Sequence, residues 1–163
     1  MIPRMPINEL VQYLIEHQIT ISAAESCSGG LISKMITDIP GCSDIYPGGV
    51  CSYSNDMKIK WLGVKETTLA QYGAVSAETA AEMAQGIRQA TGSDYGISTT
   101  GVAGPGGGSA EKPVGLVYIA VTGPDYCQVE TLPLDNTTLL SRDSIRLQTA
   151  YHALYMLQKA VIK

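Results

Sequence analysis

The chain has 163 residues and a formal net charge of −4, from 11 lysines and arginines against 15 aspartates and glutamates. This length suits one domain that folds around its own core. The sequence has no basic block that would follow a phosphate backbone, and no apolar run long enough to cross a membrane. We therefore expect a single domain over residues 1–163 whose partners include neither nucleic acid nor a membrane.

Hydrophobic periodicity switches between helical and strand spacing along the chain, with glycine, proline and capping residues at the boundaries. The expected elements are a helix from Asn8 to His17, a strand from Ile19 to Ala24, a helix after Gly30 that ends before Pro40-Gly41, a strand from Gly49 to Tyr53, a helix from Asp56 to Leu62 capped by Ser54 and Asn55, a helix from Ser76 to Gly92, strands at Tyr95–Thr99, Val114–Thr122 and Gln128–Leu134, and a last helix from about Ser141. This order predicts an α/β fold, a layered sandwich in which helices flank a mixed β-sheet.

Cysteine usage and the first residues bear on cellular location. The four cysteines form no C-x-x-C pair, and no cysteine–histidine cluster has the spacing of a zinc site. Residues 1–6 lead directly into an amphipathic segment and do not resemble a signal peptide. We expect reduced thiols, no bound metal and a cytoplasmic protein.

The turn from Glu25 to Gly30 joins a strand to a helix N-terminus, where free backbone amides suit a phosphate or a developing oxyanion. Ser26 has small residues two positions away on either side, Ala24 and Ser28, as in the nucleophile elbow, although the glycines of that motif are absent. Ser26 is therefore a candidate nucleophile. Two alternatives stay open: the serines only cap the helix, or Cys27 is the nucleophile.

A serine nucleophile needs a base, and the two histidines, His17 and His152, lie away from the glycine-rich turns and suit surface or packing roles. A lysine is the natural substitute. The segment from Tyr53 to Lys58 runs from a strand end into the first turn of a helix. Desolvation and the positive helix terminus lower the pKa of an amine in such a place. The alternative is that Lys58 is a solvated lysine on an amphipathic helix.

The densest glycine stretch runs from Thr99 to Gly115. It has neither the order of a P-loop nor the spacing of a dinucleotide-binding fingerprint, so neither ATP nor NAD follows from it. As a loop at the sheet edge it suits an anion held by backbone amides, with Lys112 as the counter-charge. A loop that only connects two strands is the alternative.

Taken together, these segments resemble the CinA C-terminal domain family of competence- and damage-inducible proteins, whose characterised members include nicotinamide-nucleotide amidases of the PncC type. The resemblance covers nearly the whole chain. It rests on Ala24-Glu25-Ser26-Cys27-Ser28-Gly29-Gly30, Tyr53-Ser54-Asn55 with Lys58, Gly73-Ala74-Val75-Ser76, Thr100-Gly101-Val102-Ala103-Gly104-Pro105, Gly107-Gly108-Ser109 and Lys112-Pro113-Val114-Gly115.

The resemblance implies hydrolysis of nicotinamide mononucleotide to nicotinate mononucleotide and ammonia, in pyridine-nucleotide salvage, without a cofactor. It implies that Ser26 is the nucleophile, that Lys58 is its general base and that Tyr53 positions or relays the proton. We assign the oxyanion donors to backbone amides from Ser26 to Gly30. The implied substrate-binding residues are Cys27, Ser28, Gly29, Gly30, Asn55, Thr100, Gly101, Ala103, Gly104, Gly107, Gly108, Ser109, Lys112 and Arg142.

Two features depart from the family pattern. Many relatives carry a larger N-terminal domain, so the resemblance implies the stand-alone form here, and it also implies a homo-oligomer. Many have Gly-Asp before the arginine of the last helix, where this chain has Leu140-Ser141 before Arg142. Arg142 and Arg146 suit a phosphate, but also a solvated helix face. A non-catalytic nucleotide-binding module of a competence or damage response is the alternative function.

Overall fold

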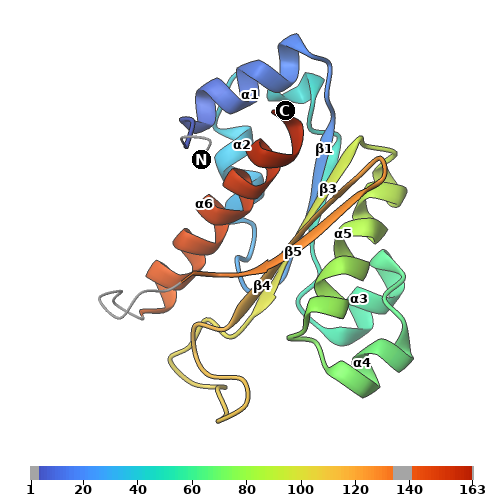
Figure 1. Ribbon diagram of the computed structural model, residues 1–163, viewed down its shortest axis with the longest axis vertical. Helices are drawn as coiled ribbons and strands as arrows, with labels where there is room; N and C mark the ends of the chain where they lie inside the picture. Colours follow the sequence, from blue (N-terminus) through green and yellow to red (C-terminus); the bar gives the residue numbers. More distant parts are fainter. Residues whose placement is uncertain (1–3, 134–140, 163) are drawn as a thin grey trace.

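The computed structural model describes residues 4–133 and 141–162 (Figure 1). Its elements are α1 (Ile7–Glu16), β1 (Ile21–Glu25), α2 (Leu31–Thr37), a short 3₁₀ helix η1 (Cys42–Asp44), β2 (Gly48–Cys51), α3 (Asn55–Leu62), α4 (Glu66–Tyr72), α5 (Ala77–Thr91), β3 (Tyr95–Gly101), β4 (Val117–Gly123), β5 (Tyr126–Thr131) and α6 (Arg142–Val161). The predicted α/β class is confirmed.

The strands form one five-stranded sheet in the order β2-β1-β3-β4-β5. β1 is parallel to both β2 and β3, whereas β4 is antiparallel to β3 and to β5. The expected mixed sheet is therefore present. At the carboxyl end of β1, Glu25 is in register with Cys51 of β2 and with Thr99 of β3. This edge of parallel strands is where ligands bind in many open α/β sheets.

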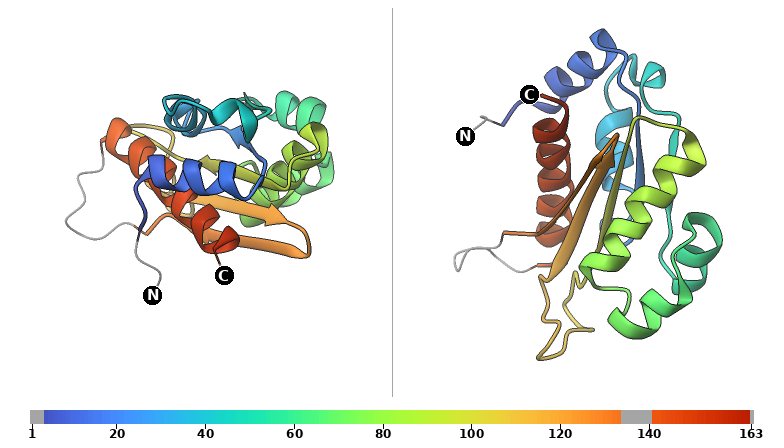
Figure 2. Two further views of the ribbon diagram at one scale, coloured as in Figure 1. Left: turned by 90° about the horizontal axis from the view of Figure 1, so that it is seen from above. Right: turned by 45° about the vertical axis from the view of Figure 1, so that its right-hand side comes forward.

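Helices cover both faces of the sheet (Figures 1 and 2). α1, α2 and α6 lie on one face, and α3, α4 and α5 lie on the other. The main apolar core packs under α6, where Ile145 and Leu157 meet strand residues such as Ile97 and Ile119. The opposite face of the sheet is covered by α5, which buries Met83 and Ile87. β1 therefore lies between these two helical layers.

Capping residues explain several helix boundaries. Ser54, Ser76 and Ser141 each accept a hydrogen bond from a backbone amide three residues later, so α3, α5 and α6 begin where the sequence indicates. Asn8 does not cap α1: that helix begins at Ile7, with Pro6 at the N-cap. The Leu10 amide donates to the Pro6 carbonyl at 3.0 Å, so helical hydrogen bonding begins before Asn8.

Two further differences concern the second half of the sheet and α4. The strand expected from Val114 begins at Val117, because the Leu116 amide bonds the Pro113 carbonyl in a turn. The sequence does not predict α4, a short helix in which only Thr68 is buried. The predicted strand end at Leu134 lies outside the described residues. Within the described ranges, no helix is long and apolar enough to cross a membrane.

Candidate active site

The turn that carries Ser26 starts where β1 ends. The Ser26 amide donates to the Thr99 carbonyl at 3.0 Å, which extends the pairing of β1 with β3 by one residue. The Gly29 amide donates to the Ser26 carbonyl at 3.1 Å and closes the turn. Gly29 and Gly30 have φ of 59° and 94°, a left-handed backbone that glycine adopts without a steric penalty. Ser26 is thus fixed at the carboxyl edge of the sheet, with 9% of its surface exposed.

Lys58 approaches Ser26 from α3, which follows the neighbouring strand β2. Lys58 is only 1% exposed, so the expectation of a solvated lysine does not describe it. Its Nζ lies 3.0 Å from Ser26 Oγ, and it donates to the carbonyls of Ser52 and Tyr53 at 2.7 and 3.3 Å. Residues 32 positions apart in the sequence therefore form one buried pair.

The partners of Lys58 determine where its lone pair points when it is neutral. A carbonyl oxygen can only accept, so the two N–H bonds of a neutral amine go to Ser52 and Tyr53. The lone pair then faces the Ser26 hydroxyl. This is the arrangement that a base needs to take a proton from a serine nucleophile.

Burial also favours the neutral amine. Desolvation lowers the pKa of Lys58 from 10.5 to about 8, while the nearby Cys27 acts in the opposite direction. At pH 7 roughly a tenth of the amine is then unprotonated. Lys58 can therefore serve as a base near neutral pH, which a solvated lysine cannot.

Cys27 is the competing nucleophile. It is 5% exposed, and burial raises the pKa of its thiol to about 11, even though hydrogen bonds and the charge of Lys58 lower it. Because the thiolate is the reactive form of cysteine, Cys27 is largely inert at neutral pH. The geometry favours Ser26 over Cys27.

Glu25 belongs to the motif from Ala24 to Gly30, and its role becomes visible only in the structure. It is fully buried, and its carboxylate accepts hydrogen bonds from five donors. These donors are Ser28 Oγ at 2.7 Å, the Gly30 amide at 3.0 Å, the Ile32 amide at 3.1 Å, the Ser33 amide at 2.8 Å and Ser33 Oγ at 2.7 Å. The sequence signal for this role is an acidic residue just before a helix N-terminus.

The expected oxyanion donors, the backbone amides from Ser26 to Gly30, are only partly available. Three of these amides donate inside the chain: Ser26 to the Thr99 carbonyl, Gly29 to the Ser26 carbonyl and Gly30 to the Glu25 carboxylate. For those three the prediction is wrong, since the turn itself and Glu25 use them. In the part of the chain that the structure describes, the amides of Cys27 and Ser28 have no backbone acceptor. These two remain as candidate donors.

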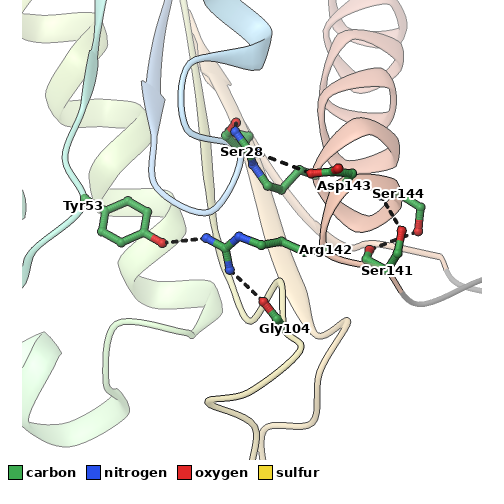
Figure 3. A network of polar contacts seen from close by, with 8 residues as sticks. Ser28, Tyr53, Gly104, Ser141, Arg142, Asp143 and Ser144 are labelled. Carbon is green, nitrogen blue, oxygen red and sulfur yellow. Dashed lines mark hydrogen bonds and ion pairs between the residues drawn. The ribbon is translucent and has the colours of Figure 1, made fainter.

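Arg142, in the first turn of α6, bridges two sides of the site (Figure 3). Its Nη1 donates to the Gly104 carbonyl at 2.7 Å, and its Nη2 donates to the Tyr53 hydroxyl at 3.0 Å. The Tyr53 phenol therefore lies against Arg142, and the part of Tyr53 that contacts Lys58 is its carbonyl. The implied role of Tyr53 in positioning or relaying the proton stays a prediction. Arg146 lies one turn further along α6 and donates to the Ser28 carbonyl at 3.3 Å.

The glycine-rich loop is tied to its neighbours. Lys112 Nζ donates to the Tyr72 carbonyl at 2.6 Å, and Thr100 Oγ1 donates to the Ala74 carbonyl at 2.7 Å. Lys112 thus attaches the loop to the end of α4, and Thr100 attaches β3 to the segment between α4 and α5. The role of Lys112 as counter-charge to an anion stays a prediction. Of the other predicted binding residues, Gly101 ends β3, Ala103 and Gly104 are buried, and Asn55, Gly107, Gly108 and Ser109 are exposed.

The histidines lie elsewhere. His17 stacks on Tyr13, and His152 bonds Glu130 at 2.8 Å on the α6 side of β5. Neither contact involves the turn at Ser26, as expected from the sequence.

The family model described as the CinA C-terminal domain matches residues 5–161. The chain belongs to the CinA C-terminal domain family. A solved structure from Agrobacterium tumefaciens, described as competence/damage inducible protein CihA, is 39% identical with a TM-score of 0.86, and the match covers 98% of each chain.

Other members of the family are more distant or longer. The competence damage-inducible protein A (ComA) from Klebsiella pneumoniae is 27% identical, with a TM-score of 0.87 over 98% of this chain and 100% of that one. A CinA-like protein of Desulforapulum autotrophicum is 55% identical over 119 residues, which cover 73% of this chain and 28% of the relative. The chain spans about a third of the length of the curated relatives it matches.

Proposed function

We propose that this CinA-family protein is an amidohydrolase that converts nicotinamide mononucleotide into nicotinate mononucleotide and ammonia. Ser26 is the nucleophile and Lys58 is the general base. The observation that carries the proposal is the buried 3.0 Å contact between Lys58 Nζ and Ser26 Oγ. The pair supports acyl transfer, and the family resemblance supplies the nucleotide amide as the substrate.

In the first step, neutral Lys58 takes the hydroxyl proton of Ser26 as Oγ attacks the carboxamide carbon. The cationic pyridinium ring withdraws electrons from this carbon and makes it more electrophilic. The oxyanion of the tetrahedral intermediate is stabilised by the Cys27 and Ser28 amides. The ammonium of Lys58 then returns its proton to the departing nitrogen, so that ammonia leaves and an ester on Ser26 remains.

The second step repeats this proton transfer with water. Neutral Lys58 takes a proton from a water molecule that attacks the ester carbonyl, and Ser26 Oγ leaves with that proton. Nicotinate mononucleotide is released, and Lys58 is again neutral. One lysine therefore serves as base and acid in both half-reactions, and the low pKa that burial gives it suits both roles.

The test is ammonia release from nicotinamide mononucleotide by the purified wild type, Ser26→Ala and Lys58→Met. Lys60→Met is the matched control, because Lys60 is an exposed lysine on the same helix. We expect Ser26→Ala and Lys58→Met each to lose about 10²-fold or more in kcat, since a nucleophile or a positioned base supplies roughly that much. Lys60→Met should match the wild type.

Wild-type rates in Lys58→Met would refute the role of Lys58 as base. A folded wild type that binds the nucleotide but releases no ammonia would refute the amidase and support the alternative, a non-catalytic nucleotide-binding module.

A further inference from the structure

The Glu25 carboxylate is surrounded only by donors. Each of its oxygens accepts at least one backbone amide and one serine hydroxyl. The three amides belong to Gly30, Ile32 and Ser33, at the N-terminus of α2. The place at this helix end where an external anion would sit is therefore occupied by a side chain of the protein itself.

The same carboxylate is linked to the backbone of the nucleophile. Ser28 Oγ donates to Glu25 at 2.7 Å and lies 2.7 Å from Thr99 Oγ1. Because the Ser28 proton goes to Glu25, the Thr99 hydroxyl is the donor in the second bond. The Thr99 carbonyl in turn accepts the Ser26 amide at 3.0 Å. A continuous chain thus runs from Glu25 through Ser28 and Thr99 to Ser26.

We infer that Glu25 is a positioning residue for the nucleophile. Its carboxylate, through Ser28 and Thr99, sets the conformation of the turn that directs Ser26 Oγ toward Lys58 Nζ. This inference rests on the proposed function, in which Ser26 reacts. It also implies that a substrate phosphate binds away from the N-terminus of α2. Glu25 itself touches neither Ser26 Oγ nor Lys58 Nζ through the hydrogen bonds described above.

Phosphonylation of Ser26 by a small fluorophosphonate tests the inference without depending on the natural substrate. The serine oxygen bonds to phosphorus, fluoride leaves and the hydroxyl proton goes to Lys58. The labelling rate therefore depends on how well Ser26 Oγ is oriented toward Lys58 Nζ. The adduct is followed by intact mass and assigned to Ser26 by peptide mapping. In parallel, the Kd of nicotinate mononucleotide is measured by calorimetry.

Glu25→Gln places an amide NH₂ against backbone donors in either orientation. We expect its labelling rate to fall about 10²-fold, the effect of a misplacement of roughly 1 Å, while the nucleotide Kd stays within about threefold of the wild type. The midpoint of the pH–rate profile should stay near the wild-type value, because Lys58 keeps its own contacts. A rate equal to the wild type would overturn the inference.

A matched pair of variants separates positioning from general stability. Ser28→Ala and Ser33→Ala each remove one hydroxyl that donates to Glu25, but only Ser28 continues toward Thr99 and Ser26. We expect Ser28→Ala to label about tenfold more slowly than Ser33→Ala, although both lose a similar hydrogen bond. Equal rates would overturn the inference, and this pair decides it if Glu25→Gln fails to fold.

The controls keep the two proposals apart. If the wild type is not labelled at Ser26, the proposed serine chemistry fails. If the wild type is labelled and all three variants label at the wild-type rate, the proposed chemistry stands and the positioning role of Glu25 is refuted.

Discussion

Lys58→Met should change the pH dependence of stability in a way that follows directly from the burial of the amine. In the folded protein the pKa of Lys58 is about 8, against 10.5 for a free lysine, because desolvation disfavours the ammonium. Below pH 8 Lys58 is protonated in both the folded and the unfolded protein, and the folded protein is destabilised by the full desolvation penalty of the buried ammonium. Between about pH 8 and 10.5 the unfolded chain binds more protons, so the unfolding free energy of the wild type rises with pH. The difference between the two pKa values corresponds to about 3 kcal/mol of unfolding free energy.

The assay is urea denaturation of the wild type and Lys58→Met at pH 7 and at pH 10.5. Methionine leaves the carbonyls of Ser52 and Tyr53 without their donor at both pH values, so this loss cancels when the two pH values are compared. We expect the wild type to gain about 3 kcal/mol relative to the variant between these pH values. Relative to Lys60→Met, which removes an exposed lysine and keeps Lys58, the wild type should gain nothing. A pH-independent difference between the wild type and Lys58→Met would refute the reasoning.

Three further predictions concern activity. kcat/KM for ammonia release should rise about fivefold from pH 7 to pH 8, because the neutral fraction of Lys58 rises from roughly a tenth to half; a flat profile over this range would exclude Lys58 as the titrating base. Cys27→Ala should keep kcat within about threefold of the wild type, since burial holds its thiol protonated, and loss of turnover with Ser26 intact would reverse the choice of nucleophile. Tyr53→Phe should retain kcat within about tenfold, because its phenol bonds Arg142 and a single such bond contributes about 1.5 kcal/mol; a deeper loss would place the phenol in the proton transfer.

Much of the fold could be predicted from local sequence. Ser54 and Ser76 mark helix starts through their capping bonds, and the alternation of apolar segments with glycine breaks gives the order of strands and helices. α4 could not be predicted, because only Thr68 within it is buried and a short helix of this kind is stabilised by its contacts with α5. The start of α1 differs because Pro6, rather than Asn8, occupies the N-cap.

The candidate site was also only partly predictable from the sequence. The sequence could mark Ser26 as lying in a strand-to-helix turn and Lys58 as lying near a helix start. Their contact depends on the parallel pairing of β1 with β2, which no local pattern specifies. The role of Glu25 depends on the tertiary approach of its carboxylate to α2, and the partners of Arg142 depend on α6 packing beside the glycine-rich loop.

The measurement that tests the central claim most directly is a rapid acid quench of the enzyme with excess nicotinamide mononucleotide, followed by intact-mass analysis and peptide mapping. An ester intermediate is the product of Ser26 attack and is trapped when the acid stops its hydrolysis. The account predicts the mass of the nicotinate mononucleotide acyl group on Ser26 in the wild type and its absence in Ser26→Ala. An adduct on Cys27, or turnover by Ser26→Ala at the wild-type rate, would contradict the account.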